Sequence, residues 1–349
     1  GVGGRRPMTA GLFELRRDAI TGWWVATLVD REFDRSRFVT SAEPVDDHGD
    51  CFNCRIPAGD GVRTRILKDF AFRTVGTEAE AREAEKSVAQ IALSQARAAG
   101  SWRTIVAPPG EHRPLHSVGI GLITELLAAA RAAVADAGRT GQTAYLQVLQ
   151  NWGRQAGSRT NHLCLDLYDL PQIPHEVAEE IGGAARFVIR ESECPYCRAV
   201  RVERERSTRF IWEDAASVAF APFASRSPFE VWIVPRRHES DFGRASDADL
   251  ASTAEGLRQV LGRLDLLGGP PYNLVLHTAP VTGQVDATYH WHWEIHPRLR
   301  EIAGLELGTG LPVNSVSPEE AADQLVRGLD RNVDDDRPGS RSGRPGGRP

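Results

Sequence analysis

The sequence predicts an α+β fold built from two similar halves, and three observations support this prediction. Two segments, 118–137 and 246–267, carry apolar residues at helical spacing over a length that no turn requires. Short β-prone runs lie on either side of each helix. The order Cys-x-x-Cys, strands, long helix, strand, loop and His-rich strand occurs twice, which indicates an internal duplication of about 150 residues per copy.

The composition is that of a globular protein without a nucleic-acid or membrane partner. The chain has 349 residues, of which 41% are hydrophobic and 26% charged, and this length suffices for two domains. The net charge of −5 argues against nucleic-acid binding, and no apolar run approaches the roughly 20 residues that span a bilayer. The 5 cysteines occur without a secretory signal. We therefore expect a cytoplasmic protein, in which paired cysteines more often hold metal than form disulfides.

The first half is predicted to combine strands with one long helix. β-prone runs at 23–28, 102–108 and 143–149 predict strands. The segment 77–99, rich in Ala and Glu, predicts a helix or a partly mobile connection, and 118–137 predicts an amphipathic helix.

Cys51-Phe-Asn-Cys54 lies between turn-forming segments, so its two thiols are predicted to project from a knuckle-like turn. Two thiolates at this spacing can bind one tetrahedral Zn²⁺ and need two further ligands from elsewhere in the chain. Redox pairs share the spacing, so the pair alone leaves both interpretations open.

Residues 151–174 form the segment around which the chain is organised. They begin as a loop of Gly and polar residues and continue as a strand in which His162, Cys164 and Asp166 share one face. A glycine turn that leads into such a strand can hold a phosphate against these side chains. The alternative is an ordinary edge strand with a hydrogen-bonded histidine and an inert buried cysteine.

The second half is predicted to repeat this plan. Residues 175–190 predict a helix followed by a strand, and Cys194-Pro-Tyr-Cys197 mirrors the first cysteine pair. The further strands are predicted at 217–222, 230–235, 272–277 and 289–295. Only His238 is a nearby further ligand for the second pair, so we expect that pair to be a relic of the duplication. Residues 331–349, rich in Asp, Arg, Gly and Pro, are expected to form a disordered tail.

The second half ends in a strand rich in imidazoles. Alternation over 289–297 places His290, His292 and Glu294 on one face and apolar side chains on the other. Two imidazoles on one strand face can bind a metal or a phosphate, with His277 as a third ligand. A buried, hydrogen-bonded histidine pair is the alternative.

These segments, in this order, resemble the galactose-1-phosphate uridylyltransferase family of the histidine-triad superfamily. The matching pieces are the Cys51/Cys54 pair, Asn151…Gly157…His162, Leu170-Pro171, Ser227–Pro235, His277, His290-x-His292, Ala303–Glu306 and Pro318-Glu319. The resemblance implies two tandem histidine-triad-like domains at 8–174 and 175–330, each an antiparallel sheet with flanking helices.

The resemblance also implies two metal sites. In many relatives the first histidine of the central motif joins two thiolates and an upstream histidine on zinc. The implied zinc ligands are therefore Cys51, Cys54, His112 and His162, with His116 as the second choice for the upstream histidine. The implied ligands of a second metal, iron or zinc, are His277, His290 and His292, with Glu180 as a possible fourth.

Two catalytic positions depart from the family pattern. Members react by a ping-pong mechanism, in which a histidine takes a nucleotidyl group from a nucleotide sugar and passes it to a sugar 1-phosphate. Their motif is His-Pro-His, a polar residue and Gln, whereas this chain has Cys164 at the position of the nucleophilic histidine and Asp166 at the position of the Gln. A thiol must first ionise, from a pKa of about 8.5. A carboxylate repels a phosphoryl group unless it is protonated or neutralised by a cation such as Arg159.

The implied substrates are a nucleotide sugar and a sugar 1-phosphate. Asn151, Gly157 and Arg159 are the residues expected to hold their phosphates, in a site shared between the two halves or between the subunits of a homodimer. The implied activity is nucleotidyl transfer of the uridylyltransferase type. Two alternatives stay open: a nucleotide-sugar hydrolase or phosphorylase with altered chemistry at Cys164 or Asp166, and a non-catalytic nucleotide-binding protein.

Overall fold

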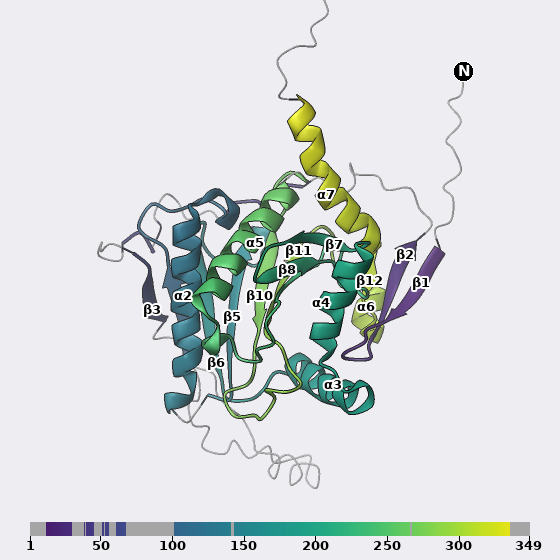
Figure 1. The fold of residues 1–349 in the computed structure, drawn as a ribbon. Coiled ribbons are helices and arrows are strands. Elements are labelled where there is room, and N and C mark those ends of the chain that lie inside the picture. The colour runs from purple at the N-terminus through teal and green to yellow at the C-terminus, as the bar shows by residue number, and fades with distance from the viewer. Residues whose placement is uncertain are drawn as a thin grey trace, which may run out of the picture.

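The main body of the protein is one nine-stranded sheet (Figure 1). The computed structural model describes residues 12–29, 38, 40–44, 51, 53–55, 61–67, 101–140, 143–265 and 267–335, so the helix predicted at 77–99 lies outside the described residues. In spatial order the strands are β3 (Arg63–Leu67), β4 (Ser101–Val106), β6 (Cys164–Leu170), β5 (Tyr145–Trp152), β10 (Tyr272–His277), β11 (His292–Pro297), β9 (Val231–Pro235), β8 (Ser217–Phe220) and β7 (Phe210–Glu213). Every neighbouring pair is antiparallel.

The two predicted halves meet edge to edge in this sheet, where β5 pairs with β10. Outward from that junction the orders β5-β6-β4-β3 and β10-β11-β9-β8 correspond, and each half inserts one long helix before its inner hairpin. These helices are α2 (Ile120–Asp136) and α5 (Asp247–Asp265). The topology thus repeats as the sequence order does, while the domain boundary between 174 and 175 stays a prediction.

Alternation along β6 places its apolar side chains on one face of the sheet and its candidate site residues on the other. Leu163, Leu165 and Leu167 are buried in one apolar cluster with residues of α2 and α5, which lie across one face of the sheet (Figure 1). Burying a leucine side chain contributes about 1.5–3 kcal/mol, so this face fixes the register of β6. Cys164 and Asp166 must then project from the opposite face.

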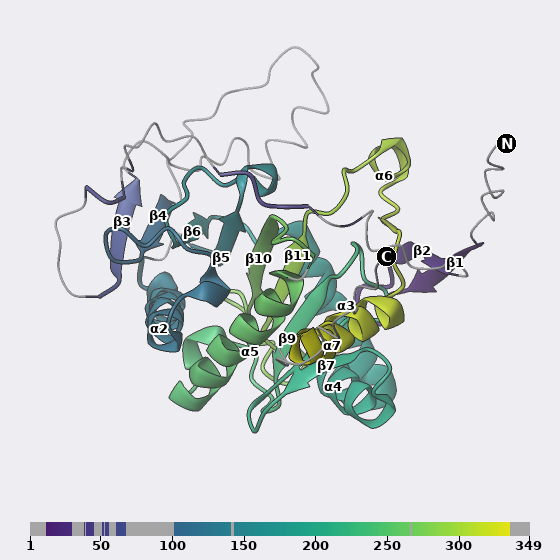
Figure 2. The same cartoon turned by 90° about the horizontal axis from the view of Figure 1, so that it is seen from above.

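A second, three-stranded sheet lies at the end of the molecule away from β3 (Figure 2). Its strands are β1 (Leu12–Arg17), β2 (Trp24–Val29) and β12 (Val313–Asn314), and β12 runs parallel to β2. The remaining helices are α3 (His175–Glu191), α4 (Pro195–Arg206), α6 (Gly304–Thr309) and α7 (Pro318–Asp335). Arg16 of β1 pairs with Glu319 of α7 at 2.9 Å, which ties the small sheet to the main body.

Three sequence expectations need correction. The segment 175–190 contains no strand, because the helical spacing of the buried residues Val177, Ala184 and Phe187 continues to its end. The Cys194/Cys197 pair leads into α4 rather than into a strand. α7 runs to Asp335 and so overlaps the start of the predicted tail, whose remainder lies outside the described residues.

The length and hydropathy of the helices in the described residues decide whether one of them could span a membrane. None of them is both long and apolar enough to cross a bilayer.

Candidate active site and metal clusters

The four predicted zinc ligands of the first half lie together. This first thiol cluster consists of Cys51, Cys54, His112 and His162, with ligand atoms within 4.8 Å of one another. His162 Nδ1 lies 3.4 Å from Cys54 Sγ, and His112 Nε2 lies 3.1 Å from the same sulfur. His162 Nε2 lies 2.9 Å from the carbonyl oxygen of Ala107. If that nitrogen carries the proton and donates it, Nδ1 keeps its lone pair toward the sulfurs.

The local backbone presents the two sulfurs of this cluster. The Cys54 N–H donates to the Cys51 carbonyl oxygen at 3.1 Å and closes a tight turn. The Gly110 N–H donates to Cys54 Sγ at 3.2 Å. His116, the second choice for the upstream ligand, lies elsewhere, 3.7 Å from an oxygen of Asp265.

A second thiol cluster, Cys194, Cys197, His238 and His290, repeats the first one in the other half. Cys197 Sγ lies 3.3 Å from His238 Nδ1 and 3.6 Å from His290 Nδ1. Cys194 is the N-cap of α4 and Pro195 is its first residue, an order that favours helix initiation directly after the first thiol. The expectation of a relic rested on the lack of a second ligand besides His238, and the structure places His290 in that position.

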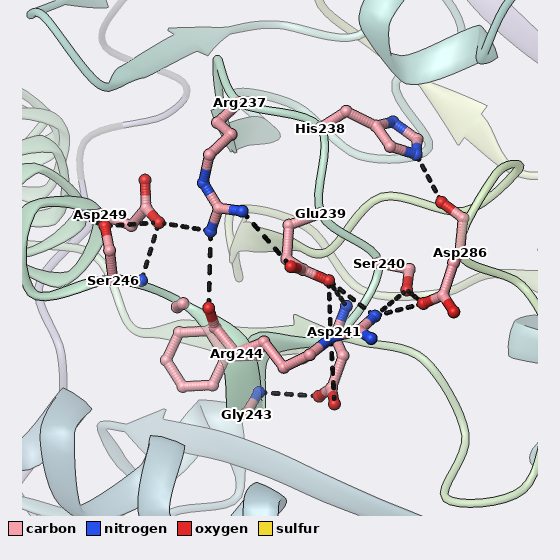
Figure 3. Close-up of polar contacts among 12 residues, drawn as sticks. Arg237, His238, Glu239, Ser240, Asp241, Gly243, Arg244, Ser246, Asp249 and Asp286 are labelled. Carbon is pink, nitrogen blue, oxygen red and sulfur yellow. Dashed lines mark hydrogen bonds and ion pairs between the residues drawn. The ribbon is translucent and has the colours of Figure 1, made fainter.

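An ion-pair network holds the loop that carries His238 (Figure 3). His238 Nε2 lies 2.6 Å from the carbonyl oxygen of Asp286, which leaves Nδ1 facing the sulfur when Nε2 donates. The Asp286 carboxylate accepts from Ser240 at 2.8 Å and from Arg244, and the hydrogen bond from Arg244 lowers the pKa of Asp286. Arg244 also pairs with Glu239 at 2.8 Å. The same arginine therefore holds Glu239, which follows His238 in the chain, and Asp286, whose carbonyl oxygen faces the imidazole.

A third group, the carboxylate–histidine cluster, consists of Glu180, His277, His292 and Glu294. Glu294 takes the place that we expected for His290. The reason is local: β11 begins at His292, so the alternation that we extended to residue 290 does not hold there. His292 Nδ1 lies 3.0 Å from the carbonyl oxygen of His290, and donation to that oxygen leaves Nε2 facing Glu294 Oε1 at 3.5 Å.

Charge governs this third cluster. His277 Nδ1 lies 2.9 Å from Glu180, and although burial opposes its charge, the carboxylates of Glu180 and Glu294 raise the pKa of His277 to about 9. Burial favours the neutral form of Glu294, but His277 and Arg226 outweigh it and hold its pKa well below the usual range. Among the described residues, His292 Nε2 and Glu294 Oε1 are buried without a hydrogen-bond partner. Buried polar atoms without partners are costly, and a metal ion that accepts both lone pairs would remove that cost.

Cys164 lies at the start of β6, beside the first thiol cluster. Burial raises the pKa of its thiol well above the usual value, and the Asp166 carboxylate adds to the effect. The thiol is therefore protonated at neutral pH and is a weak nucleophile.

Asp166 is held by neutral donors. Its Oδ1 accepts from Trp102 Nε1 at 3.1 Å and from Thr104 Oγ1 at 2.9 Å. Burial raises the pKa of Asp166 despite these hydrogen bonds and the charge of Arg159. The Arg159 guanidinium lies over the Trp102 ring, 4.5 Å from its centroid, so it borders the same surface.

The residues predicted to hold a phosphate lie near the same end of the strands, although Asn151, expected in a loop, belongs to β5. Asn273 Nδ2 donates to Asn151 Oδ1 at 2.7 Å and to the Ala156 carbonyl oxygen at 2.8 Å, which ties the turn at 154–157 to the sheet. Gly157 has a φ of +82°, a conformation that explains glycine there. Since Leu149 pairs with Asp166, the same register brings Asn151 level with Cys164. Whether these residues bind a phosphate stays a prediction.

Sequence reasoning missed three residues of these sites. Glu294 shares a strand face with His292, and this alternation was a usable signal. Trp102 and Thr104 became partners of Asp166 only through the pairing of β4 with β6, which no local pattern reveals.

Comparisons with known proteins agree with this geometry. Residues 124–338 match the family model described as "Domain of unknown function (DUF4921)". ADP-glucose phosphorylase of Arabidopsis thaliana is 32% identical over 240 residues, which cover 64% of this chain and 66% of that protein. Galactose-1-phosphate uridylyltransferase of Thermotoga maritima is 30% identical over 190 residues, covering 52% and 59%. In these alignments the chain spans less than two thirds of either relative.

Two solved structures extend the similarity over nearly the whole chain. ADP-glucose phosphorylase from Arabidopsis thaliana with bound ADP-glucose has a TM-score of 0.68 at 26% identity, over 90% of this chain and 98% of that one. A uridylyltransferase structure has a TM-score of 0.69 at 25% identity, over 92% and 100%. The predicted α+β fold of histidine-triad type, with antiparallel strands and flanking helices, is confirmed.

Proposed function

Because the chain belongs to the DUF4921 family and is related to galactose-1-phosphate uridylyltransferases, as its motifs predicted, we propose that it cleaves nucleotide sugars. In the proposed reaction a phosphate acceptor, either inorganic phosphate or a sugar 1-phosphate, takes the nucleotidyl group. The relatives include a phosphorylase and uridylyltransferases, and both kinds of acceptor occur among the substrates that their names imply.

The feature that supports a particular mechanism is the burial of the Cys164 thiol, which raises its pKa. A protonated Cys164 is a poor nucleophile, which favours direct transfer over a covalent enzyme intermediate. An acceptor oxygen would bond to the nucleotide α-phosphorus while the bond from that phosphorus to the bridging oxygen breaks. A sugar 1-phosphate then leaves with that oxygen. A phosphate acceptor is already ionised at neutral pH and needs no general base.

Asp166 is the proposed donor to the phosphoryl group. Its Oδ1 already accepts from Trp102 and Thr104. A proton on Oδ2 can therefore be donated to a phosphoryl oxygen, in the way that a glutamine amide would donate an N–H. Arg159, which lowers the pKa of Asp166 through its charge, is the proposed cation for the same group. Losing one such donor typically costs about 10²–10³ in rate.

We also propose that both thiol clusters bind zinc and that the carboxylate–histidine cluster binds iron or zinc. Two sulfurs and two imidazoles are the donor set of structural zinc, and mixed imidazole and carboxylate donors suit a harder divalent ion. A bound zinc would cross-link each Cys-x-x-Cys turn to the sheet. The metals are assigned no step in nucleotidyl transfer.

The protein is also proposed to be a homodimer. Leu12, Phe13 and Leu15 of β1 are more than half exposed. Several large apolar side chains exposed together are uncommon on the surface of a monomer. Light scattering coupled to size exclusion measures the mass directly.

The decisive experiment supplies UDP-glucose or ADP-glucose with inorganic phosphate or galactose 1-phosphate and identifies the products by mass spectrometry. We expect turnover without a nucleotidyl adduct on the protein, and Cys164→Ala should keep that turnover. Asp166→Asn should remain active because its amide donates, whereas Asp166→Ala should lose activity. An adduct on Cys164 would contradict direct transfer, and saturable binding without turnover would leave a nucleotide-binding protein.

A further inference from the structure

We propose that the metal of the carboxylate–histidine cluster is open to a pocket and accepts a small oxygen-donor ligand from it. This inference rests on the metal proposed above and adds a second ligand site, separate from β6. The pocket lies between the β1–β2 turn, α3 and the second half of the large sheet, and Trp23, Arg226 and Trp232 contribute to its walls. Glu180 and Glu294 belong both to the cluster and to the pocket lining.

The arrangement of the ligands leaves one side of the cluster accessible. The ring of His292 is enclosed by aromatic side chains, with ring centroids 4.8 Å from Trp232 and 5.0 Å from Tyr196. The carboxylates, by contrast, reach the pocket. Two imidazoles and two carboxylates leave about two positions of an octahedral ion unfilled. Those positions must face the carboxylate side, where the pocket gives access.

The two thiol clusters are internal controls, because four donors of the sulfur and imidazole type complete a tetrahedral zinc. They offer no position for an external ligand. Among these three clusters, a metal-bound external ligand is therefore assigned to the carboxylate–histidine cluster.

The charges around the pocket select the ligand. A divalent ion is neutralised by Glu180 and Glu294, and the charge of Arg226 is offset by Glu230 and Asp18, which also line the pocket. Arg226 Nη2 bonds Glu294 Oε2 at 2.8 Å and holds that carboxylate in place. The site then has no net positive charge for a phosphate dianion. It suits a hydroxyl compound or a carboxylate with one charge, the small oxygen donors that bind hard divalent ions.

Cobalt substitution of the full-length protein tests this inference. We expect three metal equivalents, and millimolar acetate should change the visible cobalt spectrum in a saturable way. Ala224→Phe, which fills the pocket without touching a ligand, should keep all three equivalents and lose the acetate response. Ala224→Leu is the milder variant if the larger one does not fold.

An unchanged spectrum with three equivalents present would overturn the inference and leave a closed structural metal. Two equivalents would overturn it together with the proposed third metal, while turnover of nucleotide sugars is measured separately and can survive both results. An equal response to inorganic phosphate would refute the assigned ligand class.

Discussion

The two halves of the large sheet present the same hairpin with different side chains. His162, Cys164 and Asp166 on β6 and the segment before it correspond in topology to His290, His292 and Glu294 on β11 and the segment before it. The first position is the same, and in both halves that histidine joins two thiols. Only the later positions differ, so one backbone presents a thiol and a carboxyl group in one half and an imidazole and a carboxylate in the other.

The partners across the hairpin decide between these two outcomes. His292 pairs with His277, whereas Asn151 is the residue level with Cys164. Glu294 is charged because His277 and Arg226 face it, whereas burial shifts Asp166 toward the neutral acid against the hydrogen bonds of Trp102 and Thr104. The half-buried carboxyl group of Asp166 and the buried one of Glu294, at matching positions, therefore have pKa values moved in opposite directions.

The largest expected effect is loss of zinc, and it should be similar in the two halves. Cys51→Ser and Cys194→Ser should each remove one equivalent and lower the melting temperature strongly, because metal binding to such clusters is worth about 10–16 kcal/mol in small zinc domains. Elemental analysis and calorimetry measure both quantities. Cys164→Ser is the matched control and should keep the full zinc content. A stable Cys194→Ser protein with unchanged zinc would restore the view that the second pair is a relic.

Glu294→Gln should have the next largest effect. It removes the buried partner of Arg226 and one of the two buried carboxylates that face His277, and breaking a buried pair costs about 3–5 kcal/mol of unfolding free energy. Because the pKa of Glu294 is lowered, this stability is present above the ordinary Glu pKa and is lost as pH falls through the lowered value. Urea unfolding of metal-free protein at several pH values measures it. Glu176→Gln removes an exposed partner of the same arginine, 3.4 Å away, and should cost less than about 1 kcal/mol.

Restoring the family pattern in the first half should change the catalytic route. Cys164→His with Asp166→Gln should increase uridylyl transfer from UDP-glucose to galactose 1-phosphate, because a neutral imidazole can attack phosphorus whereas the protonated thiol is a weak nucleophile. A nucleotidyl adduct on the new histidine should appear during turnover. If neither rate nor adduct increases, the surroundings of β6 are not those of the relatives, and the correspondence of the halves is less complete than the topology indicates.

The smallest effect is expected for Asp166→Asn, with a sign opposite to that of Glu294→Gln. Burial raises the pKa of Asp166, so its stabilising contribution is present below the ordinary Asp pKa and is lost as pH rises through the raised value. The Asn variant should therefore match the native protein at low pH and exceed its stability at neutral pH. Thermal unfolding across this range tests the sign. A variant less stable at neutral pH would mean that the ionised carboxylate is the stabilised form.

Local sequence patterns could predict much of this arrangement. The long helices, most strands and the first thiol cluster follow from periodicity, from Cys-x-x-Cys spacing and from a resemblance carried by ordered motifs. Leu163, Leu165 and Leu167 fix one face of β6, so the direction of Cys164 and Asp166 follows as well. These features depend on residues close in sequence or on a ligand set of known chemistry.

The remaining features depend on contacts between distant segments. The ligand environment of His290 could not be predicted, because it depends on where β11 begins and on the N-terminus of α4 nearly a hundred residues earlier. The raised pKa values of Cys164 and Asp166 depend on burial by other elements, which the sequence does not reveal residue by residue. Glu294, by contrast, shares a strand face with His292, so the alternation of this segment could have identified it as a ligand.

Because β5 pairs with β10, each half of the sheet protects the edge strand of the other half from solvent. A chain cut after residue 174 would remove the partner of β5 along Leu149 to Trp152 and leave unpaired backbone N–H and C=O groups there, which is a template for aggregation or strand exchange. Since β5 and β10 occupy equivalent places, a second copy of the fragment is the best available substitute for the missing half. We expect such a fragment to self-associate through β5, whereas a proline in the middle of β5, which removes a ladder donor, should leave it monomeric by size exclusion.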